Sequence, residues 1–196
     1  SPSPENLNCE LNNNKLNGIK IAVTDGDVAN FAVVSAKEGD KVVLVLVDLS
    51  SKGVEITSQN TLDPSRSHAS IKFKDADAEI LGSSQDGWAA LQEILDRAAV
   101  LFSFEQLGGA EACMDMAKEY AMGRFAFGRP IASFQAIKHK IADMYIAVEL
   151  ARSNCYFGAW ALSTDAPELA TAAATARVSA SKAFHECSKE NIQTHG

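Results

Sequence analysis

The first 82 residues carry short apolar runs that are separated by turn residues. Five of these runs have the composition of β-strands, and they span residues 19–24, 31–36, 41–48, 54–57 and 69–73. The stretches "TDGD", "KEGDK" and "SKGVE" contain the Gly and Asp that turns favour. In "IKFK", Ile71 and Phe73 fall on one face of a strand and Lys72 and Lys74 on the other. Because this alternation is typical of half-buried antiparallel strands, this half predicts a small antiparallel β-barrel or sandwich.

After Gly82 the apolar positions recur with the period of an α-helix. One helical stripe carries Trp88, Leu91, Leu95, Ala98 and Phe102. The pattern continues to about residue 127, which predicts one helix of roughly 40 residues. Such a helix is far longer than the usual mean of about 11 to 12 residues.

Two further helices are predicted behind the first. The second begins at Ser133, which we expect to be its N-cap. The third begins at Asp165, because Asp165 and Glu168 have the spacing of an acidic capping box. It is rich in alanine, which allows helices to approach closely and favours the helical state. Three long antiparallel helices with short connections predict most of a helical bundle.

The change of period near Gly82 indicates two domains and the α+β class. The stretch "GSSQDG", residues 82–87, is the expected linker. We therefore expect a β-domain over residues 1–82 and a helical bundle over residues 83–196. The helical bundle is expected to be incomplete at its end, because the closing "ENIQTHG" has neither the composition of a polar tail nor a preceding stop signal. The β-domain is expected to be incomplete at its start.

Composition and charge narrow the function. The 196 residues are 46% hydrophobic, which is sufficient for the core of one large or two modest domains. The formal net charge of −7 argues against a nucleic-acid surface, since phosphate binding needs clustered Lys and Arg. No apolar run has the length of a membrane span, and the opening "SPSPENLN" has neither the basic start nor the apolar core of a signal peptide.

The cysteines and acidic residues do not form a metal-binding pattern. The chain has four cysteines, which lie far apart and form no CxxC pair. We expect free thiols in a reducing cytoplasm and no zinc site. Asp25 and Asp27 in "TDGDVAN" resemble the start of a calcium loop, but no later acidic ligand follows at the right spacing. A hairpin turn is the favoured interpretation, so we expect no metal.

The segment "YAMGRFAFGRP", residues 120–130, ends the first predicted helix and allows two interpretations. Gly128 followed by Pro130 is a strong helix stop, and arginines near a helix C-terminus are favoured by the macrodipole. This interpretation is purely structural. Alternatively, Arg124 or Arg129 lies beside the free N–H groups of the next helix and forms a phosphate site with them, while Phe127 shields the site from water.

The same segment resembles the signature of the acyl-CoA dehydrogenase family. The matching residues are Tyr120, Arg124, Phe127, Gly128, Pro130, Ile131, Phe134, Gln135, Ala142, Asp143 and Met144. The resemblance extends through "FEQLGGAEACMDMA" to "ENIQTHG", which is similar to the start of the family's Gln-x-x-Gly-Gly element. In the first half, "LNGIK" resembles the Leu-x-Gly-x-Lys hairpin of the family's middle β-domain, so the resemblance covers nearly the whole chain.

This resemblance implies a flavoprotein enzyme. Family members use FAD to remove the α and β hydrogens of an acyl-CoA thioester, which yields a trans-2-enoyl-CoA and passes a hydride to the flavin. A carboxylate removes the α proton, and the electrons pass to a partner that is usually an electron-transfer flavoprotein. The enzymes are commonly tetramers in which two subunits contact each FAD, so a homotetramer or a dimer is expected.

The resemblance also implies roles for individual residues. Arg124 would reach the FAD pyrophosphate of a neighbouring subunit through the paired hydrogen bonds of a planar guanidinium. Thr24 would place a hydroxyl against the flavin ring. Asp96 lies near the position of a contact to the CoA arm, although an exposed helix carboxylate explains it equally well. The remaining expected cofactor contacts are Phe127, Gln135, Gln193 and Gly196, whereas the role of His195 is open.

The chain also departs from the family pattern. Ala22 stands where many members have a tryptophan beside the flavin, and the family's Thr-Glu-Pro loop is not recognisable. Ala98 occupies the alternative position for the base, and the usual position lies beyond Gly196. The catalytic base is therefore unknown. The alternative function is that of a non-catalytic relative, a structural subunit of a mixed flavoprotein assembly.

Overall fold

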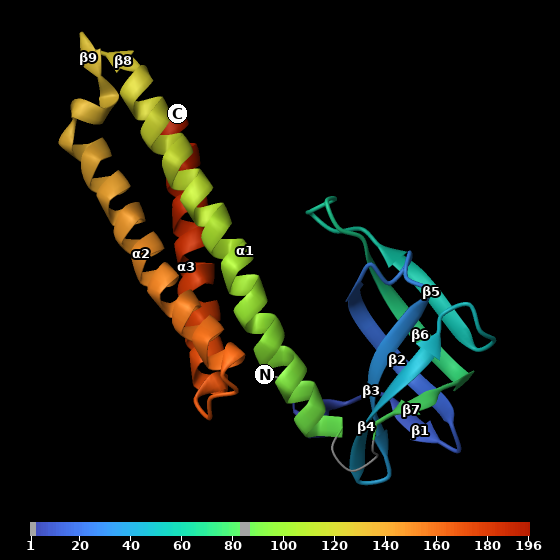
Figure 1. Cartoon of the computed structure of the whole chain (residues 1–196). Coiled ribbons are helices and arrows are strands. Elements are labelled where there is room, and N and C mark those ends of the chain that lie inside the picture. The colour runs from blue at the N-terminus through green and yellow to red at the C-terminus, as the bar shows by residue number, and fades with distance from the viewer. Residues whose placement is uncertain (1–2, 83–86) are drawn as a thin grey trace. The chain divides into compact units, whose positions relative to one another are not determined.

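The computed structural model describes residues 3–82 and 87–196, which divide into two compact units (Figure 1). The units are Ser1–Glu93 and Ile94–Gly196, and they are called here the sheet unit and the helical unit. Residues 83–86 of the expected linker lie outside the described residues. The domain boundary between residues 82 and 83 therefore stays a prediction.

The sheet unit contains one seven-stranded sheet in the order β5-β6-β2-β1-β3-β4-β7. Its strands are β1 (Glu10–Asn12), β2 (Lys15–Thr24), β3 (Phe31–Glu38), β4 (Lys41–Asp48), β5 (Val54–Gln59), β6 (His68–Asp77) and β7 (Glu79–Leu81), and a short 3-10 helix, η1 (Pro4–Asn6), precedes them. Neighbouring strands are antiparallel except β1 and β3, which pair in parallel through Glu10 and Lys37. The five predicted strands and the α+β class are confirmed. The described strands form an open sheet with β5 and β7 at its edges, so the expected barrel is not closed.

Alternating burial explains the strands of the sheet unit. On β6, Ile71 and Phe73 are buried while Lys72 and Lys74 are exposed, as the alternation predicts. The β4 strand supplies Val43, Val45 and Val47, which are all fully buried. The other buried members of this core are Cys9, Leu11, Leu16, Val34, Ala36, Leu49, Ala76 and Ala78. This core is therefore built largely from β-branched and large aliphatic side chains, which suit a pleated surface.

The described part of the helical unit contains three long helices, of which the first begins in the sheet unit. They are α1 (Gly87–Gly123, 37 residues), α2 (Gln135–Ser163, 29 residues) and α3 (Leu169–His195, 27 residues). The long first helix and the two helices behind it are confirmed. Their shared core consists of Leu107, Ala110, Met114, Ala117, Met144, Val148, Ala151, Cys155, Ala180, Ala183 and Cys187. Small residues predominate in this set, so the helices approach one another closely.

The predicted caps of α2 and α3 are wrong. The N-cap of α2 is Phe134, and the Ser133 hydroxyl instead donates to the carbonyl oxygen of Pro130 at 2.7 Å. Ser133 is occupied in this way because it ends a 3-10 turn, η2 (Ile131–Ser133). The N-cap of α3 is Glu168, without a side-chain cap bond, and Asp165 adopts a left-handed φ of 47° in the turn before it.

Gly128 does not cap the first helix. The helix ends at Gly123, and a small hairpin follows, with β8 (Phe125–Ala126) paired to β9 (Arg129–Pro130). Its two central residues, Phe127 and Gly128, have φ values of 53° and 79°. Positive φ at both central residues matches the turn types that two-residue hairpins prefer. The expected helix stop at Gly128 is therefore wrong, and the left-handed conformation of Gly128 serves a hairpin turn.

Candidate functional site

Four structural elements meet at one end of the helical unit: the end of α1, the β8–β9 hairpin, the start of α2 and the end of α3 (Figure 1). The ring of Tyr120 on α1 stacks on the ring of His195 on α3, with 4.1 Å between centroids. Lys140 near the start of α2 forms an ion pair with Glu190 near the end of α3. These contacts bring Arg124 and Gln135 to the same end of the unit as Gln193 and Gly196, which lie about 60 positions further along the chain.

The backbone around Arg124 is fixed while its side chain is exposed. The Arg124 N–H donates to the Tyr120 carbonyl oxygen at 2.9 Å, which completes the last turn of α1. The Arg124 carbonyl oxygen accepts a hydrogen bond from the Ile131 N–H at 2.8 Å, across the base of the hairpin. The guanidinium therefore extends into solvent from a well-defined position.

Arg129 differs from Arg124 in its surroundings. Its guanidinium carbon lies 4.1 Å from the centroid of the Phe134 ring, a cation–π contact. Phe127 also packs against Phe134, edge to face, with 6.3 Å between ring centroids. The side chain of Phe127 is nevertheless 97% exposed, so within this chain it shields no site from water. Among the described residues, a cation–π contact is made by Arg129 and not by Arg124.

The start of α2 adds hydrogen-bond donors. Gln135 is the first residue of this 29-residue helix and is exposed. A helix N-terminus presents free N–H groups and the positive end of the helix dipole. At the end of α3, Gln193 and Gly196 are exposed as well, while the nearby Glu190 carboxylate is engaged by Lys140 and Lys189. The two lysines compensate the negative charge of Glu190. The exposed hydrogen-bond donors at this end of the helical unit could therefore bind an anionic group.

In the sheet unit, Thr24 is the last residue of β2 and is exposed. Its hydroxyl oxygen lies 3.4 Å from Nε2 of His68. Asp27 of the following turn serves structure: its two carboxylate oxygens accept hydrogen bonds from Ser67 at 2.5 Å and Ser58 at 2.9 Å. These bonds hold the pKa of Asp27 below its usual range. The described residues contain no group of three or more acidic, His or Cys side chains that could hold a metal ion.

Ala22, which replaces the family's tryptophan, lies at an irregularity of β2. The pairing of β2 with β6 shifts register between Lys20 and Val23, and Ala22 has a left-handed φ of 52°. Its N–H donates to Oε1 of Gln59 at 3.2 Å. A hollow of about 300 Å³ between β2 and β3 borders Ala22, so the small side chain leaves open space at this position.

Asp96 and Ala98 lie on α1, far from the hairpin. Both are partly exposed. Asp96 and Arg124 are 28 positions apart, which corresponds to about 42 Å along a helix axis. The side chains of Asp96 and Arg124 therefore cannot contact the same small group. Ala98 carries only a methyl group and cannot accept a proton. Thr24 belongs to the sheet unit. Within the helical unit, Asp96 lies far along α1 from the residues at the helix ends.

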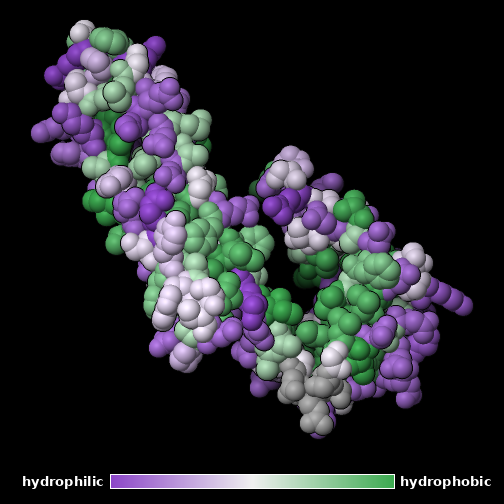
Figure 2. All heavy atoms as spheres, in the orientation of Figure 1, coloured by the Kyte–Doolittle hydropathy of each residue, from purple (hydrophilic) through white to green (hydrophobic). Residues whose placement is uncertain are grey.

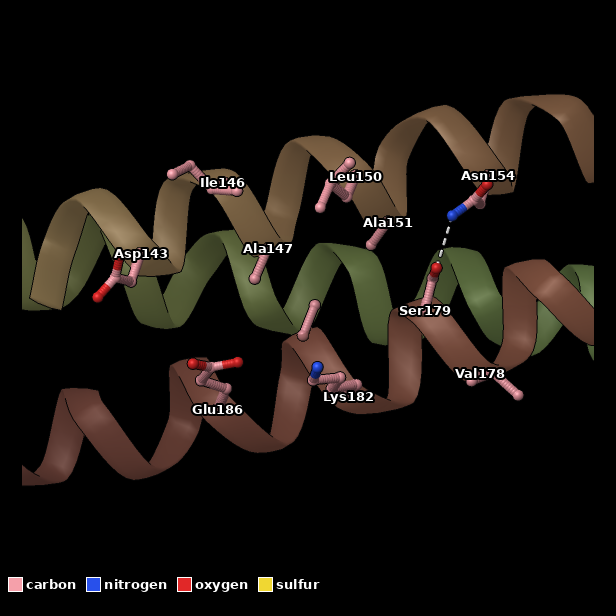
Figure 3. Close-up of a pocket in the computed structure, with 11 residues that line it drawn as sticks. Asp143, Ile146, Ala147, Leu150, Ala151, Asn154, Val178, Ser179, Lys182 and Glu186 are labelled. Carbon is pink, nitrogen blue, oxygen red and sulfur yellow. Dashed lines mark hydrogen bonds between the residues drawn. The ribbon is translucent and has the colours of Figure 1, made fainter.

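The sequence did not reveal a groove between α2 and α3 (Figure 3). It has a volume of about 480 Å³. Asp143 and Glu186 line one end of it, and at the other end Nδ2 of Asn154 donates to the Ser179 hydroxyl at 2.6 Å. The alanines of the two helices are the sequence signal for this groove, since small side chains leave space between helices.

Burial makes three of the four cysteine thiols unreactive. Cys9, Cys113, Cys155 and Cys187 are free, and all but Cys113 are buried. Burial raises the pKa of Cys187 to about 11 and also raises those of Cys9 and Cys155. Because the thiolate is the nucleophile and metal ligand, these three residues are structural.

Within residues 3–82 and 87–196, no helix combines the length and hydropathy that a membrane crossing requires.

Comparison with known proteins identifies the family of the chain. The model of the acyl-CoA dehydrogenase C-terminal domain matches residues 85–196. The chain belongs to the acyl-CoA dehydrogenase family. The resemblance stated from the motifs is thereby confirmed, and the match includes Arg124, which directly follows α1, and Gln135, the first residue of α2.

Individual relatives extend the match into the sheet unit. Probable acyl-CoA dehydrogenase YngJ of Bacillus subtilis (strain 168) is 31% identical over 192 residues, which cover 92% of this chain and 50% of YngJ. Acyl-CoA dehydrogenase IpdE2 of Mycobacterium tuberculosis (strain ATCC 25618 / H37Rv) is 47% identical over 103 residues, which cover 53% of this chain and 30% of IpdE2. The solved butyryl-CoA dehydrogenase from Megasphaera elsdenii aligns with a TM-score of 0.88 and 26% identity over 96% of this chain and 52% of its own. The chain thus spans about half the length of acyl-CoA dehydrogenases such as YngJ.

Proposed function

We propose that this chain is part of an FAD-dependent acyl-CoA dehydrogenase, which converts an acyl-CoA thioester to a trans-2-enoyl-CoA. The observation that carries the proposal is the position of Arg124. Its exposed guanidinium stands on a fixed backbone at the end of α1, at the same end of the helical unit as the start of α2 and Gln135. Enzymes named acyl-CoA dehydrogenases, such as YngJ, match over 92% of the chain.

The exposed donors at the helix ends suit the diphosphate of FAD. Arg124 would bind its oxygens through a charged, planar fork, and the N–H groups at the start of α2 would add dipoles directed at the same charge. Gln135 would contact the adenosine side, and Gln193 and Gly196 would form a further dinucleotide contact. Phe127 would pack beside the cofactor of a neighbouring subunit, which would cover its exposed ring.

The remaining roles concern the flavin ring and the substrate. FAD, when bound, supplies the acceptor for the hydride from the β carbon of the acyl chain. Thr24 would direct its hydroxyl at the flavin ring, and Asp96 would contact the CoA arm. Because Ala98 cannot remove the α proton, the base would be a carboxylate outside the present sequence.

An electron-transfer flavoprotein is the proposed acceptor of the electrons. A chain in the structure of the electron transferring flavoprotein of Acidaminococcus fermentans aligns with a TM-score of 0.88 and 28% identity over 96% of this chain and 52% of its own. This likeness supports the pairing.

We further propose a homotetramer or dimer in the cytoplasm. Hydrophobic residues reach the surface of the helical unit (Figure 2). The exposed large side chains of α2 include Tyr145, Ile146, Leu150, Tyr156, Phe157 and Trp160. Large exposed apolar patches are typical of protein interfaces, which supports an oligomer. Three buried free thiols suit a reducing compartment.

The test compares Arg124→Ala with Arg129→Ala in the intact protein. Because the exposed Arg124 guanidinium is the proposed partner of the diphosphate, Arg124→Ala should weaken FAD binding about tenfold or more, as expected for a lost hydrogen-bond partner of a charged group. Arg129→Ala removes a ring contact of the same hairpin and should change FAD binding less than threefold. Fluorescence titration of the apoprotein with FAD measures both, and circular dichroism checks the fold.

Two outcomes would contradict this assignment. An intact protein that is colourless and takes up no FAD would refute the flavoprotein function. An Arg124→Ala variant that loses helicity but still retains FAD would refute the role of Arg124 alone.

A non-catalytic relative is the second candidate function. Ala22 and Ala98 favour it, because both replace side chains that the family uses at the active site. Turnover of a panel of acyl-CoA esters by the FAD-loaded protein separates the two functions. Reduction of the flavin by any ester favours the enzyme, and flavin that stays oxidised with every ester favours the structural subunit.

A further inference from the structure

Thr24 and His68 form a cross-strand pair at the end of the β2–β6 ladder. They are direct partners in the register of the two antiparallel strands, so their side chains lie on the same face of the sheet. The hydroxyl oxygen of Thr24 lies 3.4 Å from Nε2 of His68, a long hydrogen bond. The Thr24 hydroxyl is therefore in contact with a group that can either donate or accept a proton.

The surroundings of the imidazole decide which nitrogen carries the proton. Nδ1 of His68 is buried and has no hydrogen-bond partner among the described residues. A neutral imidazole carries one N–H, and an N–H that is buried without an acceptor is unfavourable. The proton therefore belongs on Nε2, where the Thr24 oxygen can accept it. In the imidazolium both nitrogens carry protons, so Nε2 donates in that form as well.

Two acidic residues lie close enough to His68 to interact with its charge. The proximity of His68 contributes to the lowered pKa values of Asp27 and Asp63, which follow β2 and β5 respectively. Asp27 already accepts hydrogen bonds from Ser67 and Ser58. Asp63 accepts one from the Ser65 N–H. These bonds fix the Asp27 and Asp63 carboxylates in the turns to which they belong. Neither carboxylate forms a hydrogen bond with Nδ1 of His68.

We propose that His68 is a positioning residue that donates from Nε2 to the Thr24 oxygen and thereby leaves the Thr24 hydroxyl proton free for the flavin ring. This inference rests on the proposed contact between Thr24 and FAD. A hydroxyl has one proton. If His68 accepted that proton, Thr24 would offer the flavin only an oxygen lone pair. With His68 as the donor, Thr24 becomes a hydrogen-bond donor to the ring, and such a donor favours the electron-rich reduced flavin.

The first test determines the tautomer without FAD. Nitrogen-15 NMR of the imidazoles in the intact apoprotein, assigned with His68→Gln, should show His68 with a protonated Nε2 and an unprotonated Nδ1 at a pH where it is neutral. A neutral His68 with its proton on Nδ1 would overturn the inference, whatever the protein does with flavin.

The second test is a double-mutant cycle on the FAD-loaded protein. His68→Phe should weaken FAD binding about threefold to tenfold, the range of one hydrogen bond, and lower the reduction potential of the flavin. In a Thr24→Val background His68→Phe should change neither quantity further, because it acts through the missing hydroxyl. His68→Gln keeps an N–H donor on a side chain of similar length and should restore most of the potential.

The outcomes of the cycle separate this inference from the proposed function. Equal and additive effects of His68→Phe in both backgrounds would overturn the positioning role, as would an unchanged potential in His68→Phe while Thr24→Val lowers it. If the wild-type protein binds no FAD, or if Thr24→Val leaves the potential of a bound flavin unchanged, the proposed role of Thr24 itself fails.

Discussion

The sheet unit and the helical unit fill their interiors with different side chains. In the sheet unit the buried positions hold mainly Val, Leu, Ile and Phe, whereas the buried positions of the helical bundle are dominated by Ala. Large side chains fill the space above a pleated sheet, while small ones allow three long helices to approach. The sheet core is therefore expected to be sensitive to lost volume and the bundle core to added volume.

The two units also hold their proposed cofactor residues differently. In the helical unit, Arg124, Gln135 and Gln193 are exposed side chains at helix ends. In the sheet unit, Thr24 is already in contact with His68, beside a turn that Asp27 and two serines fix. The helix ends thus offer charge and dipoles to a ligand, and the strand end offers one oriented hydroxyl. Binding strength should depend more on the first set, and the properties of the flavin more on the second.

The largest expected effect is the loss of volume in the sheet core. Phe73→Ala removes a ring that is 2% exposed and should lower the free energy of unfolding of the sheet unit by about 3–5 kcal/mol. Phe31→Ala makes the same change at a position that is 60% exposed and should have a much smaller effect. Urea unfolding followed by circular dichroism measures both. Equal losses for the two variants would contradict the assigned core.

Added volume should destabilise the bundle by a smaller amount. Ala180 on α3 is fully buried in the helical core, so Ala180→Leu should destabilise the helical unit by about 1–3 kcal/mol through overpacking. Ala174→Leu makes the same change on an exposed position of the same helix and serves as the control. The urea midpoint of the far-ultraviolet signal reports the difference. A bundle that tolerates Ala180→Leu as well as Ala174→Leu would show that its core is not closely packed.

The periodicity of the chain predicted the longer elements and failed on the short ones. Five strands and three helices follow from repeats of two and 3.6 residues, because each repeat continues over several residues. The strands β1 and β7 are three residues each, too short for a repeat to be recognised. The hairpin after Gly123 carries no turn signal that separates it from the helix, because Phe127, unlike the usual Asn or Asp, occupies a left-handed position.

The site could be predicted only in part for a related reason. The family motif indicates Arg124 and Gln135, and the structure adds that helix ends bring Gln193 to the same end of the bundle. What distinguishes Arg129 from Arg124 is its packing on the Phe134 ring. Thr24 and His68 are 44 positions apart in the sequence, and the register of β2 and β6 brings them together. Such contacts between distant segments leave no periodic signal in one sequence.

The smallest expected effects come from replacing one glycine in a helix, Gly108, and one in the hairpin, Gly128. A Cβ atom at either Gly108 on α1 or Gly128 in the hairpin would meet no heavy atom within 4 Å, so backbone conformation alone separates them. Gly108→Ala should stabilise the protein by about 0.5–1 kcal/mol, since alanine favours the helix. Gly128→Ala should destabilise it by about 1–2 kcal/mol, because Gly128 has a φ of 79° and a Cβ atom is disfavoured there. Calorimetric melting temperatures should therefore move in opposite directions, and a shift of both in the same direction would contradict the hairpin turn at Gly128.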